Sequence, residues 1–184
     1  MALKREILTA IKRYDQIFSL EPHLVAHFAG LDHTMDVCSR RNDQGHITGS
    51  AYIVDLDAQK ILLIFHKGLQ RWLQPGGHLD EGELPWAAAQ REAREETGVE
   101  NFTALTWHEQ NSNAPIDFEV NAIPESKTKG EAAHYHYDFR YVYLANKSVA
   151  MRPQFEEVLH ARWFDFDEAI IYLGQRPIEK LRKL

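Results

Sequence analysis

Hydrophobic and polar positions divide the chain into an N-terminal helical segment and a later segment of strands and helices. Apolar residues recur at helical spacing over residues 3–20, with lysine and arginine between them, which predicts an amphipathic helix. Pro22 breaks this pattern, and residues 23–28 predict a second short helix that ends near Gly30. Residues 1–44 are therefore interpreted as a helical N-terminal extension that packs on the sheet or on a second subunit. We expect it to be dispensable for the chemical step; a role in gating the substrate is the alternative.

Runs of β-branched and apolar residues predict the strands of one domain over residues 45–184. The expected strands are 47–55, 61–67, a short 71–74, 102–110, 116–122, 134–145 and 159–164. The expected helices are 84–97, 165–173 and 178–184, and a Pro-Gly-Gly turn precedes the first of them. This order is typical of an α/β fold, a mixed sheet with helices on its faces.

Three carboxylates mark the predicted helix at 84–97 as a candidate site. Glu92, Glu95 and Glu96 are spaced i, i+3 and i+4, so they share one helix face at about 100° per residue. Like charges on one face repel one another, so helix stability gives no reason for this pattern. A hard divalent cation such as Mg²⁺ prefers oxygen ligands and also accepts substrate phosphates. The spacing therefore predicts a metal site, and we expect the three side chains to be exposed.

The same helix lies within a longer motif that runs from Gly77 to Val99. The pattern G-x5-E-x7-R-E-U-x-E-E-x-G-U, with U apolar, is filled at every fixed position by Gly77, Glu83, Arg91, Glu92, Ala93, Glu95, Glu96, Gly98 and Val99. The segment resembles the Nudix box, and with its strand context the resemblance extends over most of residues 45–165. It implies an α/β/α sandwich and a hydrolase that uses Mg²⁺ or Mn²⁺. Such hydrolases cleave diphosphate linkages, typically in a nucleoside diphosphate derivative.

The resemblance also implies roles for individual residues of the box. The positions that bind the divalent metals in the family are those of Glu92, Glu95, Glu96 and, through a backbone carbonyl, Gly77. The family's counterpart of the pair Glu83 and Arg91 locks the loop to the helix and orients the metal-binding carboxylates. The catalytic assignments therefore fall on Glu95, Glu92, Arg91 and Glu83.

Residues 134–141 alternate between two kinds of side chain. On a strand, His134, His136 and Asp138 face one way, and the aromatic residues between them face the core. We interpret the first face, together with nearby His78, as a substrate-binding wall in the same cleft as the glutamates; a solvated sheet face is the alternative. The general base stays open among four candidates, Glu95, Glu131, Asp138 and His136.

Composition narrows the classes of function. The 184 residues are 44% hydrophobic and 26% charged with a net charge of −6, which fits an ordinary soluble domain and argues against a nucleic-acid surface. The apolar runs are too short to span a membrane, the N-terminus lacks a signal-peptide pattern, and the single cysteine, Cys38, fits a reducing compartment. We expect a cytoplasmic protein whose partner is a small nucleotide rather than nucleic acid or membrane; a homodimer stays open.

Other functions compete with this hydrolase. A non-catalytic nucleotide sensor on the same fold would carry a degraded box, and a prenyl-diphosphate isomerase needs a cysteine near the site, whereas Cys38 lies far upstream. A hydrolase of modified nucleoside triphosphates also stays open. Pro115 lies sixteen residues after Val99, close to a proline position of ADP-ribose-cleaving relatives, and so favours ADP-ribose or a nucleotide sugar. Glu156 and Glu157 are expected in a solvated turn.

Overall fold

The computed structural model describes residues 2–19, 24, 27, 37–42, 44–126, 130–153 and 157–184. The strands are β1 (Gly45–Asp55), β2 (Lys60–His66), β3 (Arg71–Leu73), β4 (Gly76–His78), β5 (Thr103–Ala104), β6 (Asp117–Ile123), β7 (His134–Leu144) and β8 (Val158–Asp165). The helices are α1 (Ala2–Phe18), α3 (Pro85–Thr97), α4 (Thr106–Gln110), α5 (Phe166–Leu173) and α6 (Gln175–Leu181). Of the helix expected at residues 23–28, all but Leu24 and His27 lie outside the described residues.

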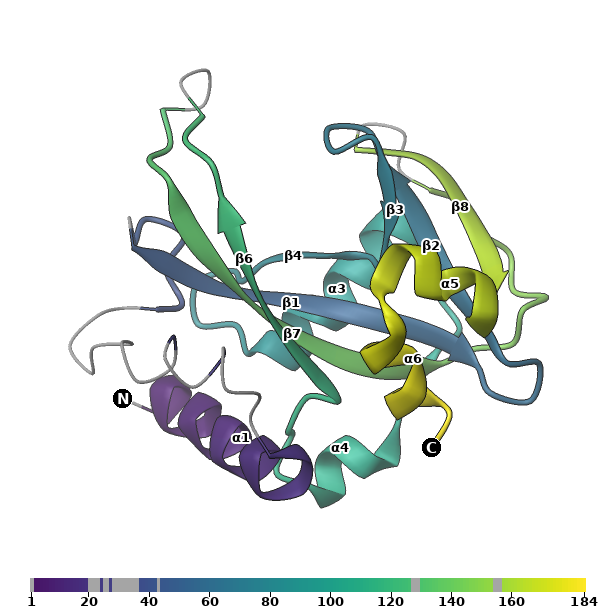
Figure 1. The fold of residues 1–184 in the computed structure, drawn as a ribbon, viewed down its shortest axis with the longest axis horizontal. Helices are drawn as coiled ribbons and strands as arrows, with labels where there is room; N and C mark the ends of the chain where they lie inside the picture. The colour runs from purple at the N-terminus through teal and green to yellow at the C-terminus, as the bar shows by residue number, and fades with distance from the viewer. Residues whose placement is uncertain are drawn as a thin grey trace.

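The strands form one mixed sheet in which β1 is central (Figure 1). The order is β3-β2-β1-β7-β5, and β4, β6 and β8 pair with β1, β7 and β2 respectively. β1 and β7 run parallel, whereas the remaining pairs are antiparallel. Because β7 occupies one edge of β1, β2 and β4 share the other edge, at residues 53–55 and 48–50.

Alternating residues of β1 point into two different hydrophobic cores. Ile47 and Ile53 belong to the core that α1 and α3 cover, whereas Tyr52 and Val54 belong to the core that α5 and α6 cover. Figure 1 shows α3 behind the sheet and α5 and α6 in front of it. Helices therefore cover both faces of a mixed sheet, which confirms the predicted α/β/α fold class.

Helix α3 has nearly the predicted bounds and packs closely on β1. Pro85 occupies its first turn, and Gly98 ends it with a φ of 64°, donating its N–H to the carbonyl of Arg94. A Cβ atom on Gly49 would lie 2.3 Å from the carbonyl oxygen of Pro85 and 2.9 Å from the nitrogen of Ala89, so only glycine fits there. This close contact fixes the position of α3 and of the carboxylates that it carries.

Two local predictions are wrong. Residues 102–110 form the short strand β5 and then helix α4 instead of one strand. His108 explains the change. Its Nδ1 bonds to the carbonyl of Ala114, and its Nε2 accepts the N–H of Val142 in β7. Together, these bonds require the chain at residue 108 to fold close to β7 instead of continuing as a strand. The two glycines at positions 76 and 77, expected in a turn, form β4 with His78 because they pair with β1.

Helix α1 packs into the same core as the sheet. Tyr14 is fully buried, and its ring meets the ring of Phe118 edge-on at a centroid distance of 4.7 Å. The guanidinium of Arg13 donates to the side-chain oxygen of Asn111 at 2.7 and 3.2 Å. The extension therefore contributes directly to the core of the folded domain. Within the described ranges, no helix is long and apolar enough to cross a membrane.

Candidate active site

Arg91 connects the loop before α3, the strand β4 and the glutamates of α3. Its guanidinium donates to the carbonyl of His78 at 2.8 Å and to the carboxylate of Glu83 at 2.9 and 3.2 Å. Its remaining terminal nitrogen donates to Glu92 at 2.8 Å and to Glu95 at 3.1 Å. The hydrogen bond with Glu83 is the main reason that the pKa of Arg91 is raised. Arg91 therefore stays charged and orients the carboxylates around it.

Glu96 and Glu92 are less exposed than the sequence predicts. Glu96 is 6% exposed and accepts a 2.8 Å hydrogen bond from the N–H of Gly76. Burial raises the pKa of Glu96 to about 8, and repulsion by Glu92, Glu157 and Glu95 adds to the shift. Burial also raises the pKa of Glu92. The expectation of three exposed carboxylates holds for Glu95 alone, because α3 presses its other two glutamates towards β4.

Gly77 gives β4 the room to pass beside these carboxylates. A Cβ atom at this position would lie 2.4 Å from Oε1 of Glu92 and 2.6 Å from its carboxyl carbon. A Cβ atom on Gly76 would lie 2.2 Å from Oγ of Ser50. Both glycines are therefore required by close packing on opposite sides of β4, and a side chain at position 77 would displace the carboxylate of Glu92.

Sequence reasoning missed two residues beside this group, Glu157 and His66. One ligand atom each from His66, Glu96 and Glu157 lies within 4.8 Å of the others. Nδ1 of His66 accepts the N–H groups of Gly68 and Leu69, so the neutral ring carries its proton on Nε2. Glu157 was expected in a solvated turn; it is exposed, but pairing of β8 with β2 brings it next to Glu96. Its partner Glu156 lies outside the described residues.

The histidines predicted to bind substrate gather into a second cluster, to which the structure adds His46. The ring centroid of His46 lies 4.7 Å from that of His136 and 5.0 Å from those of His134 and His78. Burial lowers the pKa of His78 to about 4 and that of His136 to about 3, and the neighbouring imidazoles add to both shifts. His78 and His136 are therefore neutral near pH 7. Only the pairing of β1 with β7, which no sequence pattern specifies, brings His46 here.

Asp138 lies deeper on the same strand and has a full set of partners. Its carboxylate accepts hydrogen bonds from Ser50 at 2.7 Å, Thr48 at 3.0 Å and Gln74 at 3.3 Å. The guanidinium of Arg140 donates to it at 2.9 Å. With 4% of its surface exposed, Asp138 is part of a buried hydrogen-bonded network rather than an open group beside a water-filled site.

Strand β4 lies between the carboxylates and the histidines. The backbone carbonyl of His78 in β4 accepts a hydrogen bond from Arg91, while the ring centroid of His78 lies 5.0 Å from that of His136. Gly77, the residue before it, faces Glu92. The base candidate Glu131 lies near the histidines, where its charge acts on the pKa of His78. The carboxylates and the histidines therefore lie on opposite sides of β4. That both groups line a single cleft stays a prediction.

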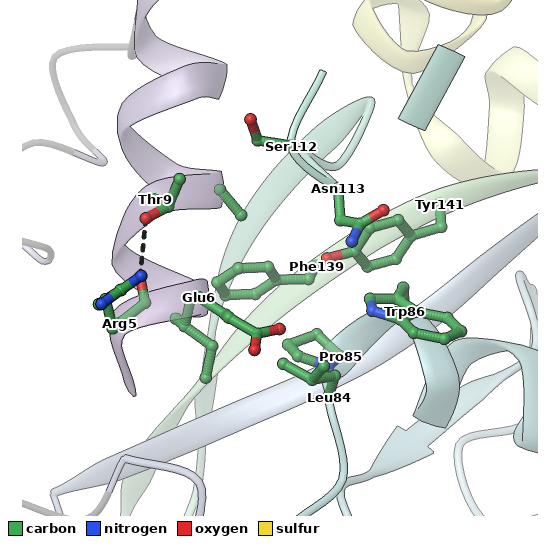
Figure 2. Close-up of a pocket in the computed structure, with 12 residues that line it drawn as sticks. Arg5, Glu6, Thr9, Leu84, Pro85, Trp86, Ser112, Asn113, Phe139 and Tyr141 are labelled. Atoms are coloured by element: carbon green, nitrogen blue, oxygen red, sulfur yellow. Dashed lines mark hydrogen bonds between the residues drawn. The ribbon is translucent and has the colours of Figure 1, made fainter. Parts of the chain in front are cut away.

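The N-terminal helix and the box meet at a third feature, a pocket of about 270 Å³ (Figure 2). Arg5, Glu6 and Thr9 of α1 line one side, and Leu84–Trp86 line another. The box carboxylates do not line it. Phe139 and Tyr141, two aromatic residues that the strand alternation assigns to the core face, also line this pocket, whereas Tyr135 of the same series is 40% exposed.

Comparison with known families matches residues 46–183 to the family described as NUDIX domain. A curated protein of Lactococcus lactis subsp. cremoris (strain MG1363), "Probable DHNTP pyrophosphohydrolase", is 32% identical over 101 residues. That match covers 55% of this chain and 55% of the relative, so the chain spans about half the length of the curated relative that it matches.

Two solved structures show the same fold. A hydrolase of the NUDIX family from Clostridium perfringens has a TM-score of 0.52 at 24% identity, over 75% of this chain and 94% of that chain. The E. coli dihydroneopterin triphosphate pyrophosphohydrolase has a TM-score of 0.53 at 14% identity, over 75% of this chain and 93% of that chain. At these identities the likeness extends to the fold alone.

Proposed function

The chain belongs to the NUDIX domain family, and we propose that it is a metal-dependent hydrolase that cleaves the diphosphate linkage of a nucleoside diphosphate derivative. The observation that carries the proposal is the convergence of Glu92, Glu95 and Glu96 beside the glycines of β4, with Arg91 bonded to two of them. A non-catalytic sensor has no need of this arrangement. The motif alone implied these roles, and the contacts give a physical basis for them.

The carboxylates fit Mg²⁺ or Mn²⁺. Glu92, Glu96 and Glu95 supply oxygen atoms, the ligand type that such ions prefer, and Gly77 lies directly against Glu92. Burial and mutual repulsion raise the pKa of Glu96 and Glu92 despite the guanidinium of Arg91 beside Glu92, so a bound cation would stabilise the charged form of both carboxylates. A bound divalent cation would neutralise the substrate's diphosphate and lower the pKa of a water molecule.

Glu95 is the proton acceptor that the geometry favours among the four candidates. It is exposed on α3, and its hydrogen bond to Arg91 holds it beside Glu92. Asp138 is enclosed by its own partners, and His136 and Glu131 lie with the histidine cluster. Glu157 is the second candidate, because it is exposed and lies near Glu96.

The first substrate class that we propose is ADP-ribose or a nucleotide sugar. Pro115 supports this weakly, because it is buried two residues before β6 and so has a packing role as well. The second class, a modified nucleoside triphosphate, is favoured by the Lactococcus relative, whose name refers to a related triphosphate that carries a pterin in place of the base. The two classes differ in their products, since a diphosphate linkage yields two monophosphates and a triphosphate yields pyrophosphate or phosphate.

A product assay separates these candidates. The full chain with Mg²⁺ is incubated with ADP-ribose, a nucleotide sugar and dihydroneopterin triphosphate at equal concentration, and ³¹P spectra identify the products. We expect AMP and ribose 5-phosphate from ADP-ribose, at a rate that chelation of the metal abolishes. Faster release of pyrophosphate from the triphosphate would favour the second class. Product formation no faster than with Glu92→Gln for every compound would reject the proposed function.

The cellular setting is also a proposal. The net charge of −6 favours a metal-bridged nucleotide over nucleic acid as partner, and a single cysteine fits the cytoplasm. Whether the chain forms a homodimer is decided by its mass in solution.

A further inference from the structure

The histidine cluster contains a buried group whose polar atoms lack partners. His46 is 3% exposed, and within the part of the chain that the structure describes, neither of its ring nitrogens has a hydrogen-bond partner. Burial lowers the pKa of His46, and the backbone of Asn42 acts against this shift without forming a hydrogen bond to either ring nitrogen. A buried polar atom without a partner destabilises the fold, so such an atom points to an unseen ligand.

We propose that His46, His134 and His136 bind one divalent transition-metal ion, of which Zn²⁺ is the representative. Three neutral imidazoles with an open fourth position are a recurrent zinc ligand set. Nitrogen ligands favour zinc, copper and nickel over Mg²⁺, whereas the carboxylates of α3 favour Mg²⁺. The site is therefore chemically distinct from the oxygen site across β4.

The distances between the three rings suit a single ion. One ligand nitrogen from each residue lies within 4.8 Å of the others, and Nε2 of His134 lies 3.1 Å from Nε2 of His136. Two nitrogens on a tetrahedral ion, each about 2.0–2.1 Å from it, are about 3.4 Å apart. The pair on β7 is therefore already near ligand spacing, and His46 needs only a small side-chain adjustment to join it.

The backbone orients one of these rings for metal binding. Nδ1 of His134 lies 2.7 Å from the carbonyl of Ala132, which accepts a hydrogen bond and therefore fixes the proton on Nδ1. The lone pair of His134 Nε2 then accepts the N–H of His136 Nε2, and a bound metal would replace this hydrogen bond, with the proton of His136 on Nδ1 instead. A second-shell carbonyl of this kind is a usual partner of a metal-binding histidine, since it sets both the tautomer and the ring orientation.

The ligands stand on rigid elements. His46 and His136 are paired residues on the parallel strands β1 and β7, and His134 follows the same face of β7. The ring of His78, from β4, lies 5.0 Å from the rings of both His46 and His136 and forms a further wall of the cluster. Arg40 and Glu131 act on the cluster as opposite charges, so no excess carboxylate charge draws a hard cation there.

An ordered water molecule is the rival occupant. Water in a buried site makes two to four hydrogen bonds, and it could bridge His46 to the histidine pair on β7. Water and metal make different predictions, because only a metal gives stoichiometric binding that depends on each histidine. The proposal does not use the glutamates, so the hydrolase assignment and this site can fail separately.

The test uses the full chain after treatment with a chelator and dialysis. Zn²⁺ is titrated in competition with a chromogenic chelator, for the wild type and for His134→Gln, His136→Gln and the control His160→Gln, an exposed histidine on β8. Thermal melts confirm that each variant is folded. The wild type and the control should bind one equivalent at high affinity, and the two ligand variants should bind that equivalent at least about 100-fold more weakly, beyond the loss of an outer partner.

X-ray absorption at the zinc edge supplies a readout that needs no variant. The wild-type protein with one equivalent of Zn²⁺ should show the scattering of at least three imidazoles. Three results overturn the proposal: no stoichiometric binding, as expected for water alone; equal affinity in the folded histidine variants; or carboxylate scattering together with loss of binding in Glu92→Gln.

Discussion

The carboxylates of α3 and the histidines of the opposite sheet face are two ligand groups that the fold stabilises in opposite ways. Glu92 and Glu95 carry like charges, and the guanidinium of Arg91 bonds to both. The histidines instead pack ring against ring, and burial lowers the pKa of His78 and His136, so both of these rings are neutral near pH 7. One group needs an added positive charge, while the other offers neutral lone pairs.

This difference has a common physical cause. Burial raises the pKa of Glu96 and lowers the pKa of His136, because a low dielectric disfavours the charged form of either group. For the carboxylate, a hard cation offsets this cost and stabilises the charged form. For the imidazole, the neutral form is already the ligand. The comparison therefore predicts separate metal preferences for two groups that share the single strand β4.

The largest effect is expected at the carboxylates. Glu96→Gln should lower the rate of metal-dependent hydrolysis by about 10³-fold or more, equivalent to about 4 kcal/mol, because the amide cannot supply the anionic ligand. Steady-state rates at saturating Mg²⁺ measure this loss. Glu100→Gln is the matched control, since Glu100 is an exposed glutamate just beyond the helix. Equal rates for the two variants would remove Glu96 from the site.

The next effect concerns Asp138, which lies between the histidines and the buried charges of the sheet. Asp138→Ala should lower the free energy of unfolding by about 3 kcal/mol, which is the lower end of the cost of removing one partner of a buried ion pair. The cost is at the lower end because Arg140 keeps Asp117, at 3.1 Å, as a second partner. Urea denaturation measures the change. Glu119→Ala, at a half-exposed position on β6, should cost much less. Lost activity without lost stability would make Asp138 a catalytic group instead.

Gly77 and Gly49, paired residues on β4 and β1 that both face α3, should separate metal binding from folding. Gly77→Ala places a methyl group against the flexible end of Glu92, so we expect a stable protein whose affinity for Mn²⁺ falls about 10–100-fold. Gly49→Ala meets the backbone of α3 and should instead lower stability by about 1–3 kcal/mol. Calorimetric titration and thermal melts of both variants test the contrast, and identical profiles for the two would contradict it.

The last effect is a pH dependence of the metal-free protein. Because the folded pKa of Glu96, about 8, lies above its ordinary value of 4.5, the folded state binds the extra proton. The contribution of this proton to the free energy of unfolding is fully present below pH 4.5. It is lost as the pH rises to about 8, at no more than about 1.4 kcal/mol per pH unit. The difference in stability between wild type and Glu96→Gln in chelator should follow this trend. A flat difference would show that Glu96 ionises normally.

The carboxylate site, whose residues are close together in the sequence, was predictable, whereas the complete histidine cluster, whose residues come from distant strands, was not. Glu92, Glu95 and Glu96 lie within two turns of one helix, and helix geometry alone places them together. The alternation of β7 correctly placed His134 and His136 on one face. His46, in contrast, joins them only because β1 runs parallel to β7 in a particular register, a choice set by the whole sheet.

The sequence also did not predict the burial of Glu96. Glu96 looked exposed because a charged side chain on a helix usually is, yet the approach of β4 through two glycines covers it. His108 turned an expected strand into α4 by bonding to a backbone group in β7. Glu157 reached the carboxylates through the pairing of β8 with β2. In each case a contact between distant segments decided the outcome.

The central claim is that α3 holds the divalent cation required for hydrolysis, independently of the histidines. Electron paramagnetic resonance of free Mn²⁺ measures binding directly, without a substrate. We predict that the double variant Glu92→Gln/Glu96→Gln loses Mn²⁺ binding, while His134→Gln/His136→Gln retains the wild-type affinity. Retention of Mn²⁺ by the folded glutamate variant, or its loss from the folded histidine variant, would contradict the account.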